Sequence, residues 1–445
     1  MEYRIISIPS TNPNEAIQTL NEELSNLKFS PNIGFIIFTP QYFGKHQSVM
    51  RFLKKRLKFE TIAFFADAFG TRDGIFTNGM LLLLLRANFK IFKTGKGNLY
   101  RQLSQIAENL KEFDAALAIY PAVYFPSRLK FLTIFFRDRF YWKRFSSCSD
   151  EACKKSILSK YSDWIKRERI MIPVNTVLRV LGKAGIPIGS INLVPLEAKP
   201  GMPAIYHNFK PIAQNILVVA FKEVDFDFKD VFPERGNSFE ETKKILSSYF
   251  ALKEEVTVLK EGNVVAEVNG MPIREYIKLR FNEWIEESEF LEKLERGEIS
   301  AITPFGLALI SKKTYGVSVI GLAPFPLNFY PFYLELNDFY DEGLVLGEIF
   351  SEKPEDFIKF EKSPPDDSHR FLLFVVDSTT LLAYRGLVYG LYEYAINNLR
   401  SDWVMFFTTL PSSFHNTNKR YISEIDQNLH FFGSGTSLFL GFCNL

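Results

Sequence analysis

Cysteine is scarce in this chain, which has only Cys148, Cys153 and Cys443 among 445 residues. Cys148 and Cys153 have a spacing seen in metal-binding pairs, but no second pair of ligands follows them in the sequence. We therefore expect free thiols and no metal site, as is usual for a protein of a reducing compartment.

Long apolar runs and a secretory signal are also missing. The first ten residues, MEYRIISIPS, include acidic, basic and polar side chains where a signal peptide has an apolar core. No stretch reaches the roughly 18 uninterrupted apolar residues that a membrane-spanning helix needs. Even the most apolar segment, 371–395, contains Asp377, Arg385 and Glu393. The sequence thus predicts a soluble, cytoplasmic protein.

Neither sign of charge dominates the chain. It has 53 Lys and Arg against 51 Asp and Glu, a formal net charge of +2. A general nucleic-acid-binding protein is expected to be clearly basic, so this balance argues against that class. Hydrophobic residues make up 47% of the chain, as in a well-packed globular protein. Glutamine is rare, which is typical of thermophilic proteins.

Known catalytic motifs are absent. The sequence has no Gly-x-Ser-x-Gly elbow, no His-Glu-x-x-His motif and no kinase signature. Ser413 and His415 form no triad by themselves, and the segment GSGTS (433–437) lacks the lysine of a phosphate-binding loop. We expect a protein without catalytic activity, with an enzyme of unrecognised type as an alternative. No cofactor is predicted. Haem held by one of the five histidines stays open, because b-type haem leaves no fixed spacing.

Strand-like and helix-like segments alternate along the first third of the chain. Strands are expected at 2–8, 33–38, 61–66 and 80–86, and helices at 14–27, 47–58 and 101–113. Such alternation predicts helices packed on a sheet, and the closeness of 80–86 to the next strand predicts that part of the sheet is antiparallel.

The second half opens with a helix and a hairpin. Ser238 stands three residues before Glu241, the spacing of a helix-starting capping box. The runs VTVLK and VVAEV then flank Glu261-Gly262-Asn263, and Asn269-Gly270 leads into an amphipathic helix. We therefore predict an α/β (mixed α+β) protein of two domains, 1–232 and 233–445, each with a mixed β-sheet covered by helices.

Residues 127–170 interrupt the alternation of the first domain. They contain twelve Lys and Arg against five Asp and Glu, interleaved with aromatic residues such as Phe136 and Trp142. We interpret the segment as an insertion or an amphipathic helical arm whose aromatic side chains face the protein. As an alternative, it binds a partner, single-stranded nucleic acid or an anionic membrane surface.

Two groups of polar residues follow apolar strands and are candidate ligand-binding residues. The first lies in the segment ADAFGTRDG (66–74) and comprises Asp67, Thr71, Arg72 and Asp73. The second is Asp377 with Arg385, set between apolar runs. Ligands of open α/β sheets bind where loops leave the carboxyl ends of strands, so both groups are placed to hold a small molecule. The alternative is that these residues form turns and ion pairs.

The order of several motifs resembles the FIST domain family. EVNGMPIREYI (267–277) after a hairpin is similar to the opening of the carboxy-terminal FIST domain. IGFIIFTPQY, IAFFADAFGTRDGIFTNGMLLLLLR and IPIGSINLVP with NILVVAFK resemble strands of the amino-terminal FIST domain. FLLFVVDSTTLLAYRGLVYGLYEYA (371–395) resembles the family's late strand, turn with Arg, and helix. Asp67 stands in the family's small Gly-Cys-x-Ser turn, and Asp377 stands where a cysteine is often found before the late Arg.

The resemblance implies a sensory module. FIST domains are regarded as binding small molecules such as amino acids, beside or fused to signalling domains. The chain has no room for an output domain beyond the two predicted ones, so the resemblance implies a stand-alone sensor that signals through a protein partner.

Overall fold

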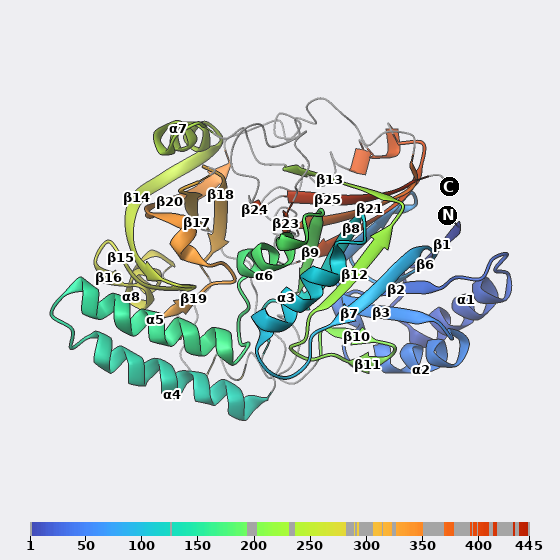
Figure 1. Cartoon of the computed structure of the whole chain (residues 1–445), viewed down its shortest axis with the longest axis horizontal. Coiled ribbons are helices and arrows are strands. Elements are labelled where there is room, and N and C mark those ends of the chain that lie inside the picture. The colour runs from blue at the N-terminus through green and yellow to red at the C-terminus, as the bar shows by residue number, and fades with distance from the viewer. Residues whose placement is uncertain are drawn as a thin grey trace.

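The computed structural model describes residues 2–124, 127–193, 203–230, 236–281, 289, 292, 306–313, 315–322, 326–349, 369–377, 392–393, 395–397, 399–408, 413–415, 430–431 and 436–443. Its described strands form four β-sheets. Three of them make up the right-hand lobe in Figure 1, and the fourth makes up the left-hand lobe. The amino and carboxyl termini lie close together on the right-hand lobe (Figure 1).

Sheet I is built from the first part of the chain. It uses β1 (Glu2–Ile8), α1 (Pro13–Ser25), β2 (Ile33–Phe38), η1 (Pro40–Tyr42), α2 (His46–Arg56), β3 (Glu60–Phe65) and β6 (Met80–Arg86). The strand order is β1-β6-β2-β3, with β2 and β3 parallel and β6 antiparallel to both of its neighbours. Every residue of β2 is buried, as expected of a central strand, whereas Glu2 and Arg4 of the edge strand β1 are exposed.

The same arrangement occurs twice more, in sheets II and III. Sheet II has the order β7-β12-β8-β9 and sheet III the order β13-β25-β21-β22, each with one parallel pair and the same antiparallel neighbours. We call the three units the first (2–86), second (88–222) and third (224–443) repeats. The strands of the second are β7 (Asn88–Lys93), β8 (Ala115–Pro121), β9 (Ile188–Leu193) and β12 (Leu217–Lys222), with helices α3 (Leu99–Leu110), α4 (Arg128–Phe145), α5 (Glu151–Arg167), α6 (Val174–Leu181) and η2 (Gly182–Ala184). Those of the third are β13 (Val224–Asp230), β21 (His369–Asp377), β22 (Asp402–Thr408) and β25 (Thr436–Cys443).

Each repeat donates a hairpin to the sheet of another repeat. The hairpins are β4 (Ala68–Thr71) with β5 (Gly74–Phe76), β10 (Ile205–His207) with β11 (Lys210–Pro211), and β23 (Ser413–His415) with β24 (His430–Phe431). The first repeat's β4 pairs with β22 of the third, the second repeat's β10 with β3 of the first, and the third repeat's β23 with β9 of the second. The exchange closes into a ring of three, so the three sheets are tied together by backbone hydrogen bonds.

One apolar core is shared by the three sheets. On the strands of the first repeat, alternate residues point to this core, and the residues between them pack against α1 and α2 on the outer face. The shared core includes Ile33, Phe35, Ile37 and Phe64 from the first repeat, Leu117, Ile119, Ile191 and Val219 from the second, and Phe371, Leu373, Val375, Val404 and Phe406 from the third.

Sheet IV is inserted into the third repeat, between β13 and β21. Its strands β14 (Phe250–Glu261), β15 (Val264–Val268), β16 (Met271–Pro272), β17 (Gly306–Ser311), β18 (Val317–Gly321), β19 (Tyr330–Pro331) and β20 (Phe339–Ile349) accompany α7 (Phe239–Tyr249), α8 (Ile273–Phe281) and η3 (Leu336–Asp338). The Ser238 hydroxyl accepts from the backbone N–H of Glu241 at the start of α7, as the capping-box spacing predicts. Asn269 and Gly270 both have positive φ, as a tight hairpin turn requires.

The mixed α/β class is confirmed, but the strands are not divided at residue 232. Strands on both sides of that position share sheets II and III, and only sheet IV is formed by one continuous segment, 250–349. The strand at 80–86 is antiparallel, but to β1 and β2, whereas β7 belongs to sheet II. Pairing between distant strands depends on contacts that local sequence patterns do not contain.

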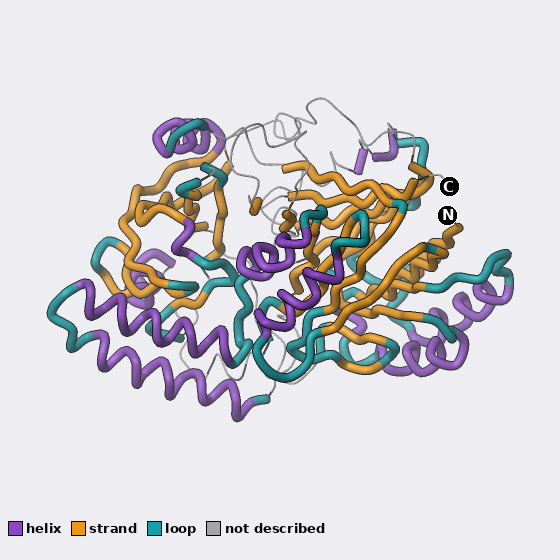
Figure 2. Tube along the Cα trace, viewed as in Figure 1, coloured by secondary structure: helices purple, strands orange, loops and turns teal. Residues whose placement is uncertain are grey.

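Residues 127–170 form a helical hairpin, α4 and α5, which run side by side below the left-hand lobe (Figure 2). A disulfide joins Cys148 to Cys153 in the turn between the helices, so the expectation of free thiols at these positions is wrong. The spacing that suggested an incomplete metal pair brings the two Cα atoms to 5.6 Å, a distance that a disulfide spans. The hairpin is the predicted helical arm, and its buried residues include Phe131, Phe135, Tyr161 and Trp164. Phe136 is exposed, so the expectation that its side chain faces the protein is wrong.

Candidate functional site

Four of the predicted ligand-binding residues lie at the two ends of β4 in sheet III. Asp67 precedes β4, whereas Thr71, Arg72 and Asp73 form its far end and the turn to β5. Because β4 is antiparallel to β22, Asp67 lies at the carboxyl end of β22 and the other three lie at its beginning. The four residues were predicted as one group because they are close in the sequence, but the length of β4 separates Asp67 from the other three.

Asp67 lies in a row with Asp377 and Thr408 on three neighbouring strands. The backbone N–H of Asp67 donates to the carbonyl of Phe407 at 2.8 Å. Thr408, the next residue, is the register partner of Asp377 on the parallel strand β21. The structure thus brings two of the predicted residues to one edge of sheet III and adds a threonine between them.

This row occupies the end of the shared core. Asp377 follows Val375 by two residues and Thr408 follows Phe406 by two, so these positions share the face of the sheet that supplies the core. The corresponding position of the first repeat, two residues after Ile37, is Thr39. Its hydroxyl donates to the carbonyl of Gly79 and accepts from the Gly79 N–H. Asp67 is half-buried. Asp377 and Thr408 thus end the parallel strands β21 and β22, and Asp67 lies beside them just before β4. Aspartate and threonine are residue types suited to binding a cationic group.

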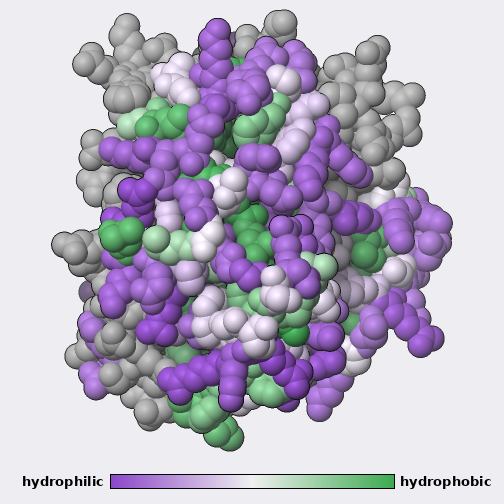
Figure 3. All heavy atoms as spheres, turned by 90° about the vertical axis from the view of Figure 1, so that its left-hand side faces the viewer, coloured by the Kyte–Doolittle hydropathy of each residue, from purple (hydrophilic) through white to green (hydrophobic). Residues whose placement is uncertain are grey.

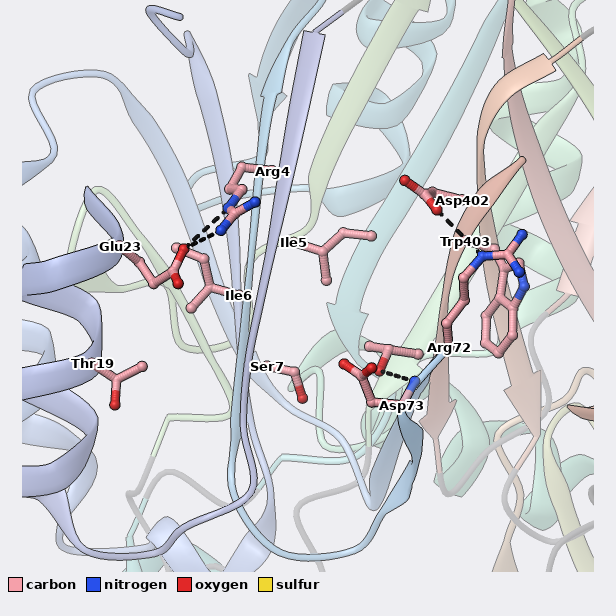
Figure 4. A pocket seen from close by; sticks show the side chains of 11 residues that line it. Arg4, Ile5, Ile6, Ser7, Thr19, Glu23, Arg72, Asp73, Asp402 and Trp403 are labelled. Atoms are coloured by element: carbon pink, nitrogen blue, oxygen red, sulfur yellow. Dashed lines mark hydrogen bonds and ion pairs between the residues drawn. The ribbon is translucent and has the colours of Figure 1, made fainter. Parts of the chain in front are cut away.

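The other end of β4 borders a groove of about 290 Å³. In Figure 4, strand β1 runs between an ion pair of Arg4 with Glu23 and an ion pair of Arg72 with Asp402. The groove therefore lies where the edge strand of sheet I meets sheet III. Its full lining comprises Arg4, Ile5, Ile6, Ser7, Thr19, Glu23, Thr71, Arg72, Asp73, Asp402 and Trp403.

Arg72 acts as a clamp between repeats. Its Nη2 donates to the backbone carbonyls of Leu399, Arg400 and Ser401 at 2.8, 3.0 and 2.8 Å, and its Nε lies 3.3 Å from Asp402. Leu399 also donates its N–H to Ala395, so these carbonyls follow a helical turn and attract a cation. A guanidinium engaged in this way serves the junction between the first and third repeats rather than a ligand carboxylate.

Replacing Arg72 by methionine is expected to lower the free energy of unfolding by about 1 to 2 kcal/mol, because hydrogen bonds from a charged donor are lost at a half-exposed site. Chemical denaturation followed by circular dichroism measures this change. Arg86→Met is the matched control, since Arg86 forms only an exposed ion pair with Glu2 and should cost no more than about 0.5 kcal/mol. Equal effects of the two substitutions would show that the Arg72 contacts contribute nothing special.

The remaining candidates are placed as follows. Arg385 lies outside the described residues. His46 is buried, its Nε2 lies 2.9 Å from the Tyr206 hydroxyl, and burial lowers the pKa of His46. His207 pairs with Glu60 at 2.7 Å. Among the described residues no group of three or more His, Cys, Asp or Glu has the geometry of a metal site, and no described helix is long and apolar enough to cross a membrane.

Sequence reasoning missed Thr408 and Asp402. Each stands at an end of β22, but neither is marked by a motif, since threonine and aspartate at strand ends are common turn residues. The signal that links them to Asp67 and Arg72 is strand pairing between positions more than 300 residues apart.

A protein from Archaeoglobus fulgidus, described as an uncharacterized protein, is 30% identical to this chain over 369 residues. The match covers 82% of this chain and 95% of the relative. A family model described as AF0772-like protein C-terminal domain matches residues 240–351. The chain belongs to the AF0772-like family.

The matched domain of the AF0772-like family corresponds to the inserted lobe. Residues 240–351 run from α7 to the end of β20, the last strand of sheet IV. The similarity to the A. fulgidus protein is longer than this segment, so it also includes parts of the three repeats. Family membership therefore applies to both lobes, while the candidate site belongs to the repeats.

Proposed function

We propose that this protein is a FIST-type sensor that binds a small molecule at the carboxyl edge of sheet III. The observation that carries the proposal is the row of Asp67, Thr408 and Asp377 on three adjacent strands. The order of FIST-like motifs supports it, and the motif EVNGMPIREYI falls within the segment matched by the AF0772-like model. The protein acts without catalysis in the cytoplasm, and its signal passes to a protein partner.

The ligand carries an ammonium group. Two aspartates in one row of adjacent strands favour a cationic ligand, which would make charge-assisted hydrogen bonds with their carboxylates. The Thr408 position adds a hydroxyl that is able to donate to a neighbouring acceptor. An amino acid or a similar amine-bearing metabolite has this chemistry.

Asp67→Asn and Asp377→Asn are each expected to weaken ligand binding about 10- to 100-fold, because each removes one charge-assisted hydrogen bond. The ligand is first identified by native mass spectrometry of gently purified protein and a panel of amino acids and amines in thermal-shift assays. Isothermal titration calorimetry of the variants then gives the dissociation constants. Asp73→Asn, in the same segment but at the opposite end of β4, is the matched control and should bind as the unmodified protein does.

Four results would contradict the proposal. One is unchanged affinity in both variants, and another is an equal loss in the Asp73→Asn control. The third is a Soret band in the absorption spectrum of the purified protein, which would identify haem, and not an amine, as the ligand. The fourth is chemical alteration of the ligand during incubation, which would identify the protein as an enzyme and not a sensor.

A further inference from the structure

The outward face of α4 combines exposed apolar residues with basic ones. Leu129, Phe136 and Phe140 have exposed fractions of 77%, 67% and 45%, and they follow each other at helical spacing along one side of the helix. The opposite side packs on α5 and the inserted lobe through Phe131, Phe135 and other residues of the arm's core. Helix α4 therefore has a second apolar stripe, which the described part of the chain leaves exposed.

Basic side chains border this stripe on both sides. At 100° per residue, Arg139 and Lys143 lie on one flank of the stripe, and Arg137 and Arg144 lie on the other. The only acidic residue in α4 is Asp138, which is 1% exposed and faces the inserted lobe. Apolar and strongly hydrophilic atoms lie side by side along the lower edge of the molecule in Figure 3, at the level of α4 in Figure 1.

We propose that this face of α4 binds the surface of an anionic lipid bilayer, with the helix lying parallel to the membrane plane. An apolar stripe between two basic rows matches a bilayer interface, where Leu and Phe enter the acyl boundary and Lys and Arg meet anionic headgroups. The helix is the outermost element on its side of the molecule, so a flat surface can approach it (Figure 2).

Other occupants fit this face less well. A second copy packed on the same stripe would bring basic rows together without acidic partners on α4. Stacking of nucleic-acid bases needs free aromatic faces, but the Arg144 guanidinium lies 4.3 Å from the Phe140 ring centre. At a membrane surface the Arg144 guanidinium can stay at the level of the headgroups while the Phe140 ring inserts below it.

Co-sedimentation of the full-length protein with lipid vesicles tests the proposal. We expect binding to vesicles of phosphatidylcholine mixed with phosphatidylserine, and little binding to phosphatidylcholine alone. Binding should weaken strongly between about 0.1 M and about 1 M salt, since the screening length falls from roughly 10 Å to roughly 3 Å.

Two sets of substitutions separate the apolar and the charged contributions. The triple variant Leu129→Ser, Phe136→Ser and Phe140→Ser is expected to lower the vesicle partition coefficient about 100-fold, because three apolar side chains no longer insert. The double variant Lys143→Gln and Arg144→Gln should lower it about 30-fold. Leu279→Ser on α8 is the control, since Leu279 is 68% exposed on another helix.

Several outcomes would overturn the proposal. They are unchanged binding of the triple variant, equal binding to neutral vesicles, a loss in the Leu279→Ser control equal to that of the triple variant, and no vesicle binding at all. Binding of a single-stranded oligonucleotide that is lost in the triple variant would identify nucleic acid as the partner instead. All substituted residues are exposed, and melting temperatures within a few degrees of the unmodified protein show that the variants fold. The small-molecule test above uses other residues and a different readout, so the two proposals fail separately.

Discussion

Gly262→Ala is expected to destabilise the contact between the helical arm and sheet IV by about 3 kcal/mol. Gly262 has φ of +60°, and a Cβ added there would lie 2.2 Å from the Ser162 hydroxyl and 2.8 Å from its Cβ. The new methyl group would push α5 away from the hairpin turn. That movement would break the hydrogen bonds between Ser162 and Asn263, of 2.7 and 3.1 Å, which are buried.

Hydrogen exchange measured by mass spectrometry reports this change as faster exchange in α5 and in the β14–β15 hairpin. Gly270→Ala is the control, because Gly270 has a similar φ of +71° with no atom within 4 Å of the added Cβ. It should cost only the backbone strain, about 1 to 2 kcal/mol. Adding Ser162→Gly to Gly262→Ala should recover part of the loss. Equal effects of the two alanine substitutions would show that backbone strain, not the contact with α5, determines the cost.

The second large effect concerns Asp138, the buried carboxylate of α4. Its Oδ2 accepts from the backbone N–H of Asn328 at 3.0 Å and from the side-chain amide of Asn328 at 2.6 Å, and its Oδ1 accepts from the N–H of Phe329 at 3.0 Å. Burial raises the pKa of Asp138 from 3.8 to about 6, against the opposite effect of these hydrogen bonds. The contacts position Phe329, whose ring lies 5.0 to 5.4 Å from the rings of Tyr161, Trp142 and Phe145.

A raised pKa in the folded state means that the folded protein holds the proton more tightly than the unfolded chain. The contribution of Asp138 to stability is thus fully present below about pH 4 and is lost as the pH rises through about 6. The size of this term is about 3 kcal/mol, at 1.36 kcal/mol for each pH unit between the two values. Asp138→Asn does not titrate, so the unmodified protein should gain about this much relative to the variant between pH 7 and pH 4.

Hydrogen exchange of α4 at several pH values, corrected for the intrinsic pH dependence of exchange, measures this difference. The amides of α1 and α2 in the other lobe are the internal reference and should respond alike in both proteins. A constant difference between the two proteins from pH 4 to pH 7 would refute the raised pKa of Asp138.

Local patterns were sufficient for most individual elements. The fully apolar runs at 33–38 and 80–86 are strands because every residue in them is buried, apart from Arg86 at the last position. Helix α7 starts directly after Ser238, because the Ser238 hydroxyl satisfies a backbone N–H that would otherwise lack a partner. The hairpin turns at Gly262 and Asn269-Gly270 follow from residues that tolerate positive φ. Each of these features depends on residues close together in the chain.

The candidate site could be predicted only in part. Asp67 and Asp377 stand out in the sequence because polar residues follow strongly apolar strands, and the structure brings their strands to one edge of sheet III. Arg72 stands out for the same reason, yet its guanidinium binds carbonyls at 399–401. No local pattern distinguishes a ligand-binding arginine from one that joins two parts of a fold.

The sequence by itself determined the α/β class, most strands and helices of the first repeat and the helical arm. The reason is that burial, helix capping and turn geometry act over a few residues. Tertiary structure alone decided the threefold repetition, the exchange of hairpins, the insertion of sheet IV and the roles of Arg72 and Thr408. These features come from hydrogen bonds and packing between segments up to several hundred residues apart. Very different sequences can form the same strand pairing, so local sequence does not specify which strands pair.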